Sequence, residues 1–160
     1  DFLVTPMQIA QATALIASSK LLTPHLVKDI GKKPYKPISK DVLTDNELSK
    51  LPIIRKAMYQ VCNSPHGTAT NYIHSKVVIA GKTGTAQVVG IKQDIETRRK
   101  EHELSYYSRS HAWFTTYGPY EDPQYVVTVM VEHGGHGGHA AGGIVSDIYN
   151  KLLELDYIKK

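Results

Sequence analysis

The most informative segment of the chain is Val77-Val78-Ile79-Ala80-Gly81-Lys82-Thr83-Gly84-Thr85-Ala86-Gln87. An apolar run of strand length leads into a Lys-Thr-Gly tripeptide with small residues on both sides. The pattern predicts a strand over Lys76–Ala80 that resumes across a glycine as Thr85–Val89. Alternatively, the same residues could form a glycine-rich strand turn that binds no ligand.

Helical patterns surround this stretch. Thr5 and Pro6 predict the start of a first helix, which is apolar on nearly all sides and is therefore expected to be buried. A second helix is predicted from about Ser49 to Cys62; Thr44 has capping-box spacing, but Pro52 favours Ser49 as the cap. A closing helix is predicted over Ile144–Leu155, with Ile148, Leu152 and Leu155 on one face.

Two more strands are predicted, over Ser110–Tyr117 and Gln124–Glu132, joined by a hairpin loop at Gly118–Pro123. Lys20–Lys40 is interpreted as a connecting segment that contains one short strand, His25–Ile30. Lys92–Ser108 is polar, with weak helical character. Consecutive strands linked by hairpins imply an antiparallel sheet with helices packed on it, which is an α+β fold.

The composition narrows the function classes. The 160 residues carry 19 basic and 15 acidic side chains, for a net charge of +4. The basic residues are scattered except for Arg98-Arg99-Lys100, which has glutamates around it and is interpreted as a solvated loop. No nucleic-acid partner is therefore predicted, although an anionic cell-wall glycan would also suit a mild positive charge. No apolar run reaches the ~20 residues of a membrane span. Cys62, the single cysteine, is expected to be a buried structural thiol.

Several motifs then follow one another in a recognisable order. They are Leu3-Val4-Thr5-Pro6-Met7-Gln8-Ile9-Ala10, Gly67-Thr68-Ala69, Ala80–Val88, His111-Ala112-Trp113-Phe114, Pro119, Val131-Glu132-His133-Gly134-Gly135 and Gly137-Gly138-His139-Ala140-Ala141. This series resembles the C-terminal part of the class B penicillin-binding proteins, most closely the elongation type, penicillin-binding protein 2. Lys-Thr-Gly is one of the three signatures of this serine acyltransferase group.

The resemblance implies a role for each residue of the strand. Lys82 is the catalytic candidate, supplying positive potential, while Thr83 would bond the carboxylate of a substrate. Gly84 would let an extended peptide lie against the strand, and the amide of Thr85 would point at a developing oxyanion. The implied activity is peptidoglycan D,D-transpeptidation in cell-wall elongation and cell-shape maintenance, without a cofactor. The implied partners are stem peptides, β-lactams and elongation-machinery membrane proteins, at the periplasmic face of the inner membrane.

The sequence departs from the family pattern in two ways. It has no Ser-x-x-Lys and no Ser-x-Asn element; Ser18-Ser19-Lys20 has the wrong spacing. Residues 1–160 are therefore expected to be the C-terminal portion of a single transpeptidase domain, with the catalytic serine in an N-terminal portion of the same protein. Gly142-Gly143 replaces the usual proline after the paired alanines, which predicts a looser start of the last helix. A division-type penicillin-binding protein and a non-catalytic β-lactam or peptide-binding module stay open as alternatives.

Two other features leave alternatives open. His133, His136 and His139 are separated by glycine pairs and could converge on zinc or nickel, but a flexible loop with solvated histidines is favoured, so no metal is predicted. Trp113 and Phe114 are expected on opposite faces of their strand, one in the core and the other toward a cleft.

Overall fold

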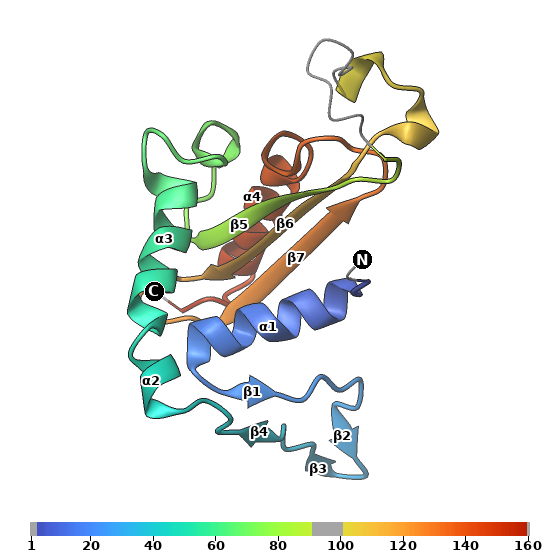
Figure 1. The fold of residues 1–160 in the computed structure, drawn as a ribbon. Helices are drawn as coiled ribbons and strands as arrows, with labels where there is room; N and C mark the ends of the chain where they lie inside the picture. Colours follow the sequence, from blue (N-terminus) through green and yellow to red (C-terminus); the bar gives the residue numbers. More distant parts are fainter. Residues whose placement is uncertain (1–2, 91–100, 160) are drawn as a thin grey trace.

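A computed structural model describes residues 3–90 and 101–159. At its centre is a three-stranded antiparallel sheet in the order β5-β6-β7, formed by β5 (Ala80–Ala86), β6 (His111–Gly118) and β7 (Tyr125–Val131) (Figure 1). Helix α1 (Pro6–Ser18) packs against β6 and β7, and α4 (Gly137–Glu154) packs behind the sheet. Helix α3 (Leu51–Asn63) lies beside β5. The predicted α+β arrangement is confirmed.

Neighbouring residues on β6 show which helix covers which face. Phe114 is fully buried and belongs to a core cluster with Val145 and Tyr149 of α4. The next residue, Thr115, points to the other face, where its hydroxyl lies 2.8 Å from that of Thr13 on α1. The main core therefore lies between the sheet and α4. A smaller cluster connects α1 and α3 with the sheet through Ala17, Met58, Ala80 and Tyr117.

Helix α1 begins as its sequence predicts but is less buried than expected. Thr5 caps it in a capping box with Gln8, and Pro6 lies in the first turn. Only Thr13 and Ala17 are buried, however, and Met7 is 54% exposed. Within the described residues, the expectation of burial on nearly all sides is wrong, because apolar composition does not specify which sides of a helix meet a partner. Among the described residues, one side packs on β6 and β7.

Two short ladders form the segment after α1. Strand β1 (Leu21–Leu22) pairs with β4 (Ser39–Lys40), and β2 (Asp29–Ile30) pairs with β3 (Lys33–Pro34). The single strand predicted over His25–Ile30 is therefore confirmed only at Asp29–Ile30, and the other three short strands were not predicted. The pairing is between residues that come together only when the chain folds back on itself, and prolines limit its length because they lack an amide donor.

The next helical region is divided into two helices. Helix α2 (Asp45–Leu48) is capped by Thr44, whose hydroxyl and amide both bond to Glu47 in a capping box. Helix α3 starts at Leu51 after Lys50, which makes no side-chain cap bond. The preference for Ser49 as the cap is thus wrong. The Thr44 box satisfies backbone donors reciprocally, and the proline near the start of α3 needs no partner for an amide.

The strands of the sheet are placed well, with one correction. Strands β6 and β7 each lie within one residue of their predicted bounds. Strand β5 is one continuous strand over Ala80–Ala86 that contains the Lys-Thr-Gly tripeptide. The expectation of two pieces, Lys76–Ala80 and Thr85–Val89, is wrong, because residues 76–79 and 87–89 are not in a strand. Gly84 stays in register opposite Trp113, so the glycine does not break the ladder. Of the polar stretch Lys92–Ser108, residues 92–100, including Arg98-Arg99-Lys100, lie outside the described residues. The remainder forms two short 3-10 helices, η3 (Glu101–Glu103) and η4 (Tyr106–Ser108).

The closing helix begins earlier than predicted and buries a different face. It starts at Gly137 rather than Ile144. Val145 and Tyr149 are fully buried. Of the three residues expected on the buried face, Leu152 packs against the core, while Ile148 is 37% exposed and Leu155 53%. Gly142 is closely packed, since a Cβ there would lie 2.7 Å from the Cβ of Tyr72. The looser start expected from Gly142-Gly143 is wrong, because the helix begins before these glycines and Gly142 lets it pack closely against Tyr72.

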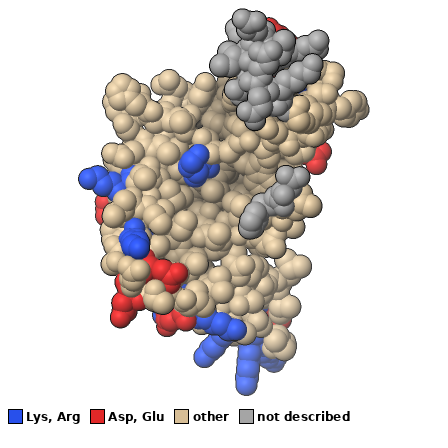
Figure 2. Space-filling model, in the orientation of Figure 1, with Lys and Arg blue, Asp and Glu red and all other residues tan. Residues whose placement is uncertain are grey.

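The surface carries its charges in separate places. On the face drawn in Figure 2, basic side chains gather at the lower end of the view, over the β2–β3 ladder, and acidic ones lie near α2. Over the described ranges, no helix combines the length and apolarity needed to cross a bilayer.

Candidate active site

Strand β5 is one of the two edge strands of the sheet, and it carries all four predicted site residues. Lys82, Thr83, Gly84 and Thr85 lie opposite Thr115, Phe114, Trp113 and Ala112 of β6. Within residues 3–90 and 101–159, no strand pairs with the other edge of β5. An unpaired edge presents backbone donors and acceptors that can bind an extended peptide.

Lys82 and Thr83 leave the strand on opposite faces, because side chains alternate along a strand. Lys82 shares a face with Thr115 on the α1 side, while Thr83 shares one with Phe114 on the α4 side. Lys82 is exposed and Thr83 half-buried. The ammonium group of Lys82 nevertheless donates a 2.6 Å hydrogen bond to the carbonyl oxygen of Thr83, which brings its charge back to the strand.

Backbone groups of an outer antiparallel strand point alternately toward the neighbouring strand and toward the open edge. The Thr83 carbonyl is reached by Lys82, as expected of a group at the open edge. Thr85 is two residues farther along and has the same orientation in the ladder. Its amide is therefore also expected at the open edge, on the same side as the Thr83 carbonyl.

Gly84 lies where two other elements approach closely. A Cβ at Gly84 would lie 3.2 Å from the Cβ of Trp113, which is a tight contact. The first residue of α4, Gly137, also lies close to this part of the ladder. A Cβ on Gly137 would lie 2.6 Å from the Gly84 carbonyl oxygen and would clash with the Trp113 carbonyl oxygen. The absence of a side chain at Gly84 therefore allows close packing against Trp113, in addition to any role in ligand binding. The start of α4 rests directly on the β5–β6 ladder.

One further residue meets the predicted strand residues. The hydroxyl of Thr68 lies 2.9 Å from that of Thr83. Thr68 belongs to the loop between α3 and the 3-10 helix η1 (Thr70–Tyr72). The sequence motif Gly67-Thr68-Ala69 marks this loop, but nothing in the local pattern says that it reaches β5. The contact joins segments 15 residues apart.

A second loop is fastened beside the start of α4 by Glu101. Its carboxylate accepts hydrogen bonds from the Ser110 hydroxyl at 2.6 Å and the Ser110 amide at 3.0 Å. The Ser110 carbonyl in turn accepts from the Gly135 amide at 2.9 Å. Burial acts to raise the pKa of Glu101, but the Ser110 bonds, with His136 and Arg109 nearby, outweigh it and lower the pKa below its usual value.

The three histidines of the glycine-rich segment have separate neighbours. The His133 amide donates to Nδ1 of His111, and its own Nδ1 lies 3.2 Å from the Arg109 carbonyl oxygen. His139 is in edge contact with Tyr72, and His136 lies near Glu101. The segment is thus not a flexible loop throughout, because the first turn of α4 includes Gly137 and Gly138, which are buried. No group of three His, Cys, Asp or Glu within the described ranges could hold a metal ion; that the segment needs no metal stays a prediction.

Cys62 and the Trp113-Phe114 pair have the burial that the sequence predicts. Cys62 is 3% exposed within the main core, as predicted, and burial raises the pKa of its thiol to about 12. Phe114 is in the core and Trp113 is half-buried on the other face, as alternation requires.

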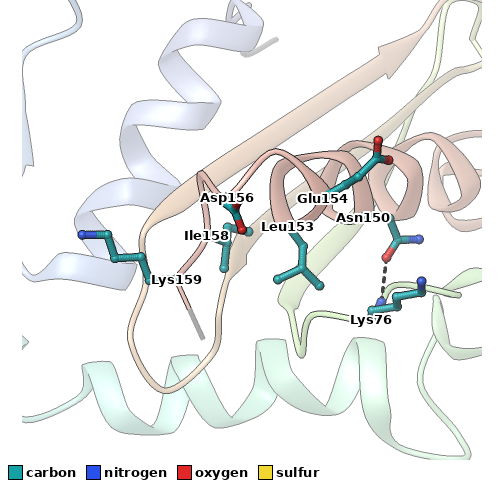
Figure 3. Close-up of a pocket in the computed structure, with 7 residues that line it drawn as sticks. All are labelled: Lys76, Asn150, Leu153, Glu154, Asp156, Ile158 and Lys159. Atoms are coloured by element: carbon teal, nitrogen blue, oxygen red, sulfur yellow. Dashed lines mark hydrogen bonds between the residues drawn. The ribbon is translucent and has the colours of Figure 1, made fainter.

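A pocket of about 610 Å³ lies away from this strand, at the C-terminal end of α4 (Figure 3). The Lys76 amide donates to Oδ1 of Asn150 at 2.8 Å at its rim. None of the residues that line it belongs to Lys82–Thr85: they are Lys76, Asn150, Leu153, Glu154, Asp156, Ile158 and Lys159.

Comparison with curated proteins finds relatives along most of the chain. The peptidoglycan D,D-transpeptidase MrdA of Haemophilus influenzae is 33% identical over 157 residues, covering 93% of this chain and 24% of the relative. The protein of the same name from Acinetobacter baumannii is 36% identical over 148 residues, covering 88% and 21%. The chain therefore spans about a quarter of the length of the curated relatives that it matches.

Solved structures agree with this comparison. A complex of penicillin-binding protein 2 (PBP2) with MreC from Helicobacter pylori matches with a TM-score of 0.81 and 42% identity, over 98% of this chain and 26% of that one. PBP2 of Pseudomonas aeruginosa, in complex with WCK 5153, matches with a TM-score of 0.73 and 32% identity, over 94% and 30%. The family model of the penicillin-binding protein transpeptidase domain matches residues 2–153. Together with the Lys-Thr-Gly edge strand, these matches show that the chain belongs to the penicillin-binding protein transpeptidase domain family.

Proposed function

We propose that this chain is the C-terminal portion of the transpeptidase domain of an elongation-type peptidoglycan D,D-transpeptidase. The observation that carries the proposal is the open edge of β5, where Lys82, Thr83 and Thr85 follow one another. An edge strand with a cation and a hydroxyl suits an extended peptide that ends in a carboxylate.

Each residue of the strand has a proposed task. Thr83 donates a hydrogen bond to the substrate carboxylate, and Lys82 supplies the positive potential and supports proton transfer near the nucleophile. The Thr85 amide, at the open edge, stabilises the oxyanion that forms from the attacked carbonyl. Gly84 has no side chain, so a peptide backbone can approach the strand closely.

The reaction is an acyl transfer in two steps. A serine hydroxyl attacks the carbonyl of the D-Ala-D-Ala bond, its proton passes to the leaving nitrogen and D-alanine departs. The amine of a neighbouring stem peptide then takes the acyl group and frees the serine. Because the 160 residues contain neither a Ser-x-x-Lys nor a Ser-x-Asn element, we propose that the nucleophile and its base come from another part of the parent protein. β-Lactams would acylate the same serine, and no cofactor is needed.

The same relatives support a proposed cellular setting for the parent protein. The H. pylori structure contains PBP2 together with MreC, which supports a membrane-associated elongation protein as a partner of the parent protein. The parent protein is then proposed to act at the periplasmic face of the inner membrane, with stem peptides as its substrate. The proposed function involves no nucleic-acid partner.

A fluorescent penicillin tests the proposal. The full-length parent should form a covalent adduct that survives denaturing electrophoresis, and the 160-residue chain alone should form none, since it lacks the nucleophile. Circular dichroism of both proteins controls for folding. A stable adduct on the isolated chain would contradict the division of the site between the two portions, and a parent that binds penicillin without an adduct would be a non-catalytic binding module.

Depletion of the parent protein in its host separates elongation from division. Loss of an elongation transpeptidase should turn rod-shaped cells into rounded ones, because side-wall synthesis stops while septation continues. Filaments would instead identify a division-type enzyme. Complementation with the parent gene, and with a Lys82→Ala variant as the matched control, ties the shape to this strand.

A further inference from the structure

The Thr68 hydroxyl has a definite place beside the proposed carboxylate-binding group. It lies 2.9 Å from Oγ1 of Thr83. Among the described residues, no other side chain or backbone group forms a hydrogen bond with the Thr83 hydroxyl. Thr68 is exposed and Thr83 half-buried, so both can be reached from solvent.

The direction of this hydrogen bond depends on what Thr83 binds. A hydroxyl has one proton to donate, and an ionised carboxylate can only accept. If Thr83 gives its proton to a carboxylate, it can meet Thr68 only as an acceptor, with Thr68 as the donor. Accepting that bond polarises the Thr83 hydroxyl, which strengthens the bond it donates.

The loop that carries Thr68 is fixed from two sides. The Ala69 amide donates to the Val61 carbonyl of α3 at 3.0 Å, and the Thr70 hydroxyl donates to the Ser64 carbonyl at 2.6 Å. On the other side, α4 approaches so closely that a Cβ on Gly138 would lie 2.6 Å from the Thr68 carbonyl oxygen. The backbone therefore sets the position of the Thr68 hydroxyl, and only its side-chain torsion is left to adjust.

From this geometry we propose that Thr68 is a positioning residue, which holds the Thr83 hydroxyl as a donor toward the carboxylate of a stem peptide or β-lactam. The inference rests on the proposed function of β5. It assigns a role to the Gly67-Thr68-Ala69 loop that acts through Thr83. Thr68 matters to ligands that carry a free carboxylate and not to others.

The test compares benzylpenicillin with its methyl ester in the full-length parent protein, using the second-order acylation rate. Thr68→Val should slow acylation by benzylpenicillin about three- to tenfold, since one hydrogen bond in a network is lost. Thr68→Ser, which keeps the hydroxyl, should stay near the parent rate. With the methyl ester, which has no anion to accept the Thr83 proton, Thr68→Val should match the parent. The double variant Thr68→Val/Thr83→Val should be no slower than Thr83→Val alone.

The outcomes distinguish the two proposals. If Thr83→Val slows acylation by benzylpenicillin while Thr68→Val does not, the role of Thr68 is refuted and the function of β5 stands. An equal loss with both probes, or additive losses in the double variant, would also refute it, because Thr68 would then act on the fold or on another group. If Thr83→Val acylates at the parent rate with both probes, the substrate role of β5 fails and the inference fails with it. Melting temperatures of all variants control for stability.

Discussion

The ammonium group of Lys82 donates a 2.6 Å hydrogen bond to the carbonyl oxygen of Thr83, the next residue along β5. The two side chains leave the strand on opposite faces, yet this bond keeps the charge of Lys82 beside the backbone of Thr83. A ligand that binds at the open edge of β5 would therefore meet the cation and the hydroxyl together.

Substitution of these two residues should slow acylation of the parent protein to different degrees. Thr83→Val keeps the shape and removes one charge-assisted hydrogen bond, worth about 1.5–3 kcal/mol, or roughly tenfold to a hundredfold in second-order rate. Lys82→Ala should cost more, because it changes the electric field and the proton transfer. Stopped-flow acylation with a β-lactam measures both, with circular dichroism as the control. Two folded variants that both acylate at the parent rate would show that β5 is not the substrate platform.

Two glycines of α4 should respond oppositely to the same substitution. Gly137→Ala forces a Cβ against the carbonyl oxygens of Gly84 and Trp113, so it should destabilise the protein by about 1–3 kcal/mol. Gly143→Ala is the matched control, since its Cβ would lie 3.6 Å from Cε1 of His74, an ordinary contact. It should stabilise the helix by about 0.5–1 kcal/mol. Urea unfolding measures both, and a similar effect at the two positions would contradict the close approach of α4 to β5.

Glu101 should make the stability of its loop depend on pH. Its folded pKa is lowered by the Ser110 bonds and by His136 and Arg109, so its contribution is complete above the unfolded pKa of about 4.3 and is lost as the pH falls through the folded pKa. Glu101→Gln should lower the melting temperature at pH 7 by about 2–4 °C, and this difference should shrink below about pH 4. Glu132→Gln is the control, because the Glu132 side chain is exposed. A difference that persists unchanged in acid would show that the charge of Glu101 is not the cause.

Cys62 should be inert in the folded protein. The thiol is 3% exposed, and burial raises its pKa to about 12, so little thiolate forms at neutral pH. Labelling by a maleimide at pH 7.5 should be slower than that of a denatured sample by about a hundredfold or more, with the rate set by opening of the core. Cysteine added to the same buffer controls for the reagent. Rapid labelling of the native protein would place Cys62 outside the core.

The features that the sequence alone predicts correctly are those set by interactions between residues close together in the chain. The Thr5 cap, the burial of Cys62 and the bounds of β6 and β7 depend on residues within a few positions of one another, and the structure agrees with each. The tripeptide at Lys82 likewise pointed to a peptide-binding strand, whose site roles stay proposals. Short-range patterns of this kind survive in any context that provides a partner for the apolar face.

Contacts between distant segments decided the rest. The start of α4 at Gly137 depends on its fit against Gly84 and Trp113, and no local signal in the glycine-rich segment indicates this. The histidines that could have met in one place have separate partners, since His133 binds a backbone carbonyl and a second imidazole on another segment. The meeting of Thr68 with Thr83 also arises only in the folded chain. A sequence specifies which groups can bond within a turn or a strand, whereas the tertiary structure alone determines which loops and helices are brought to the same edge of a sheet.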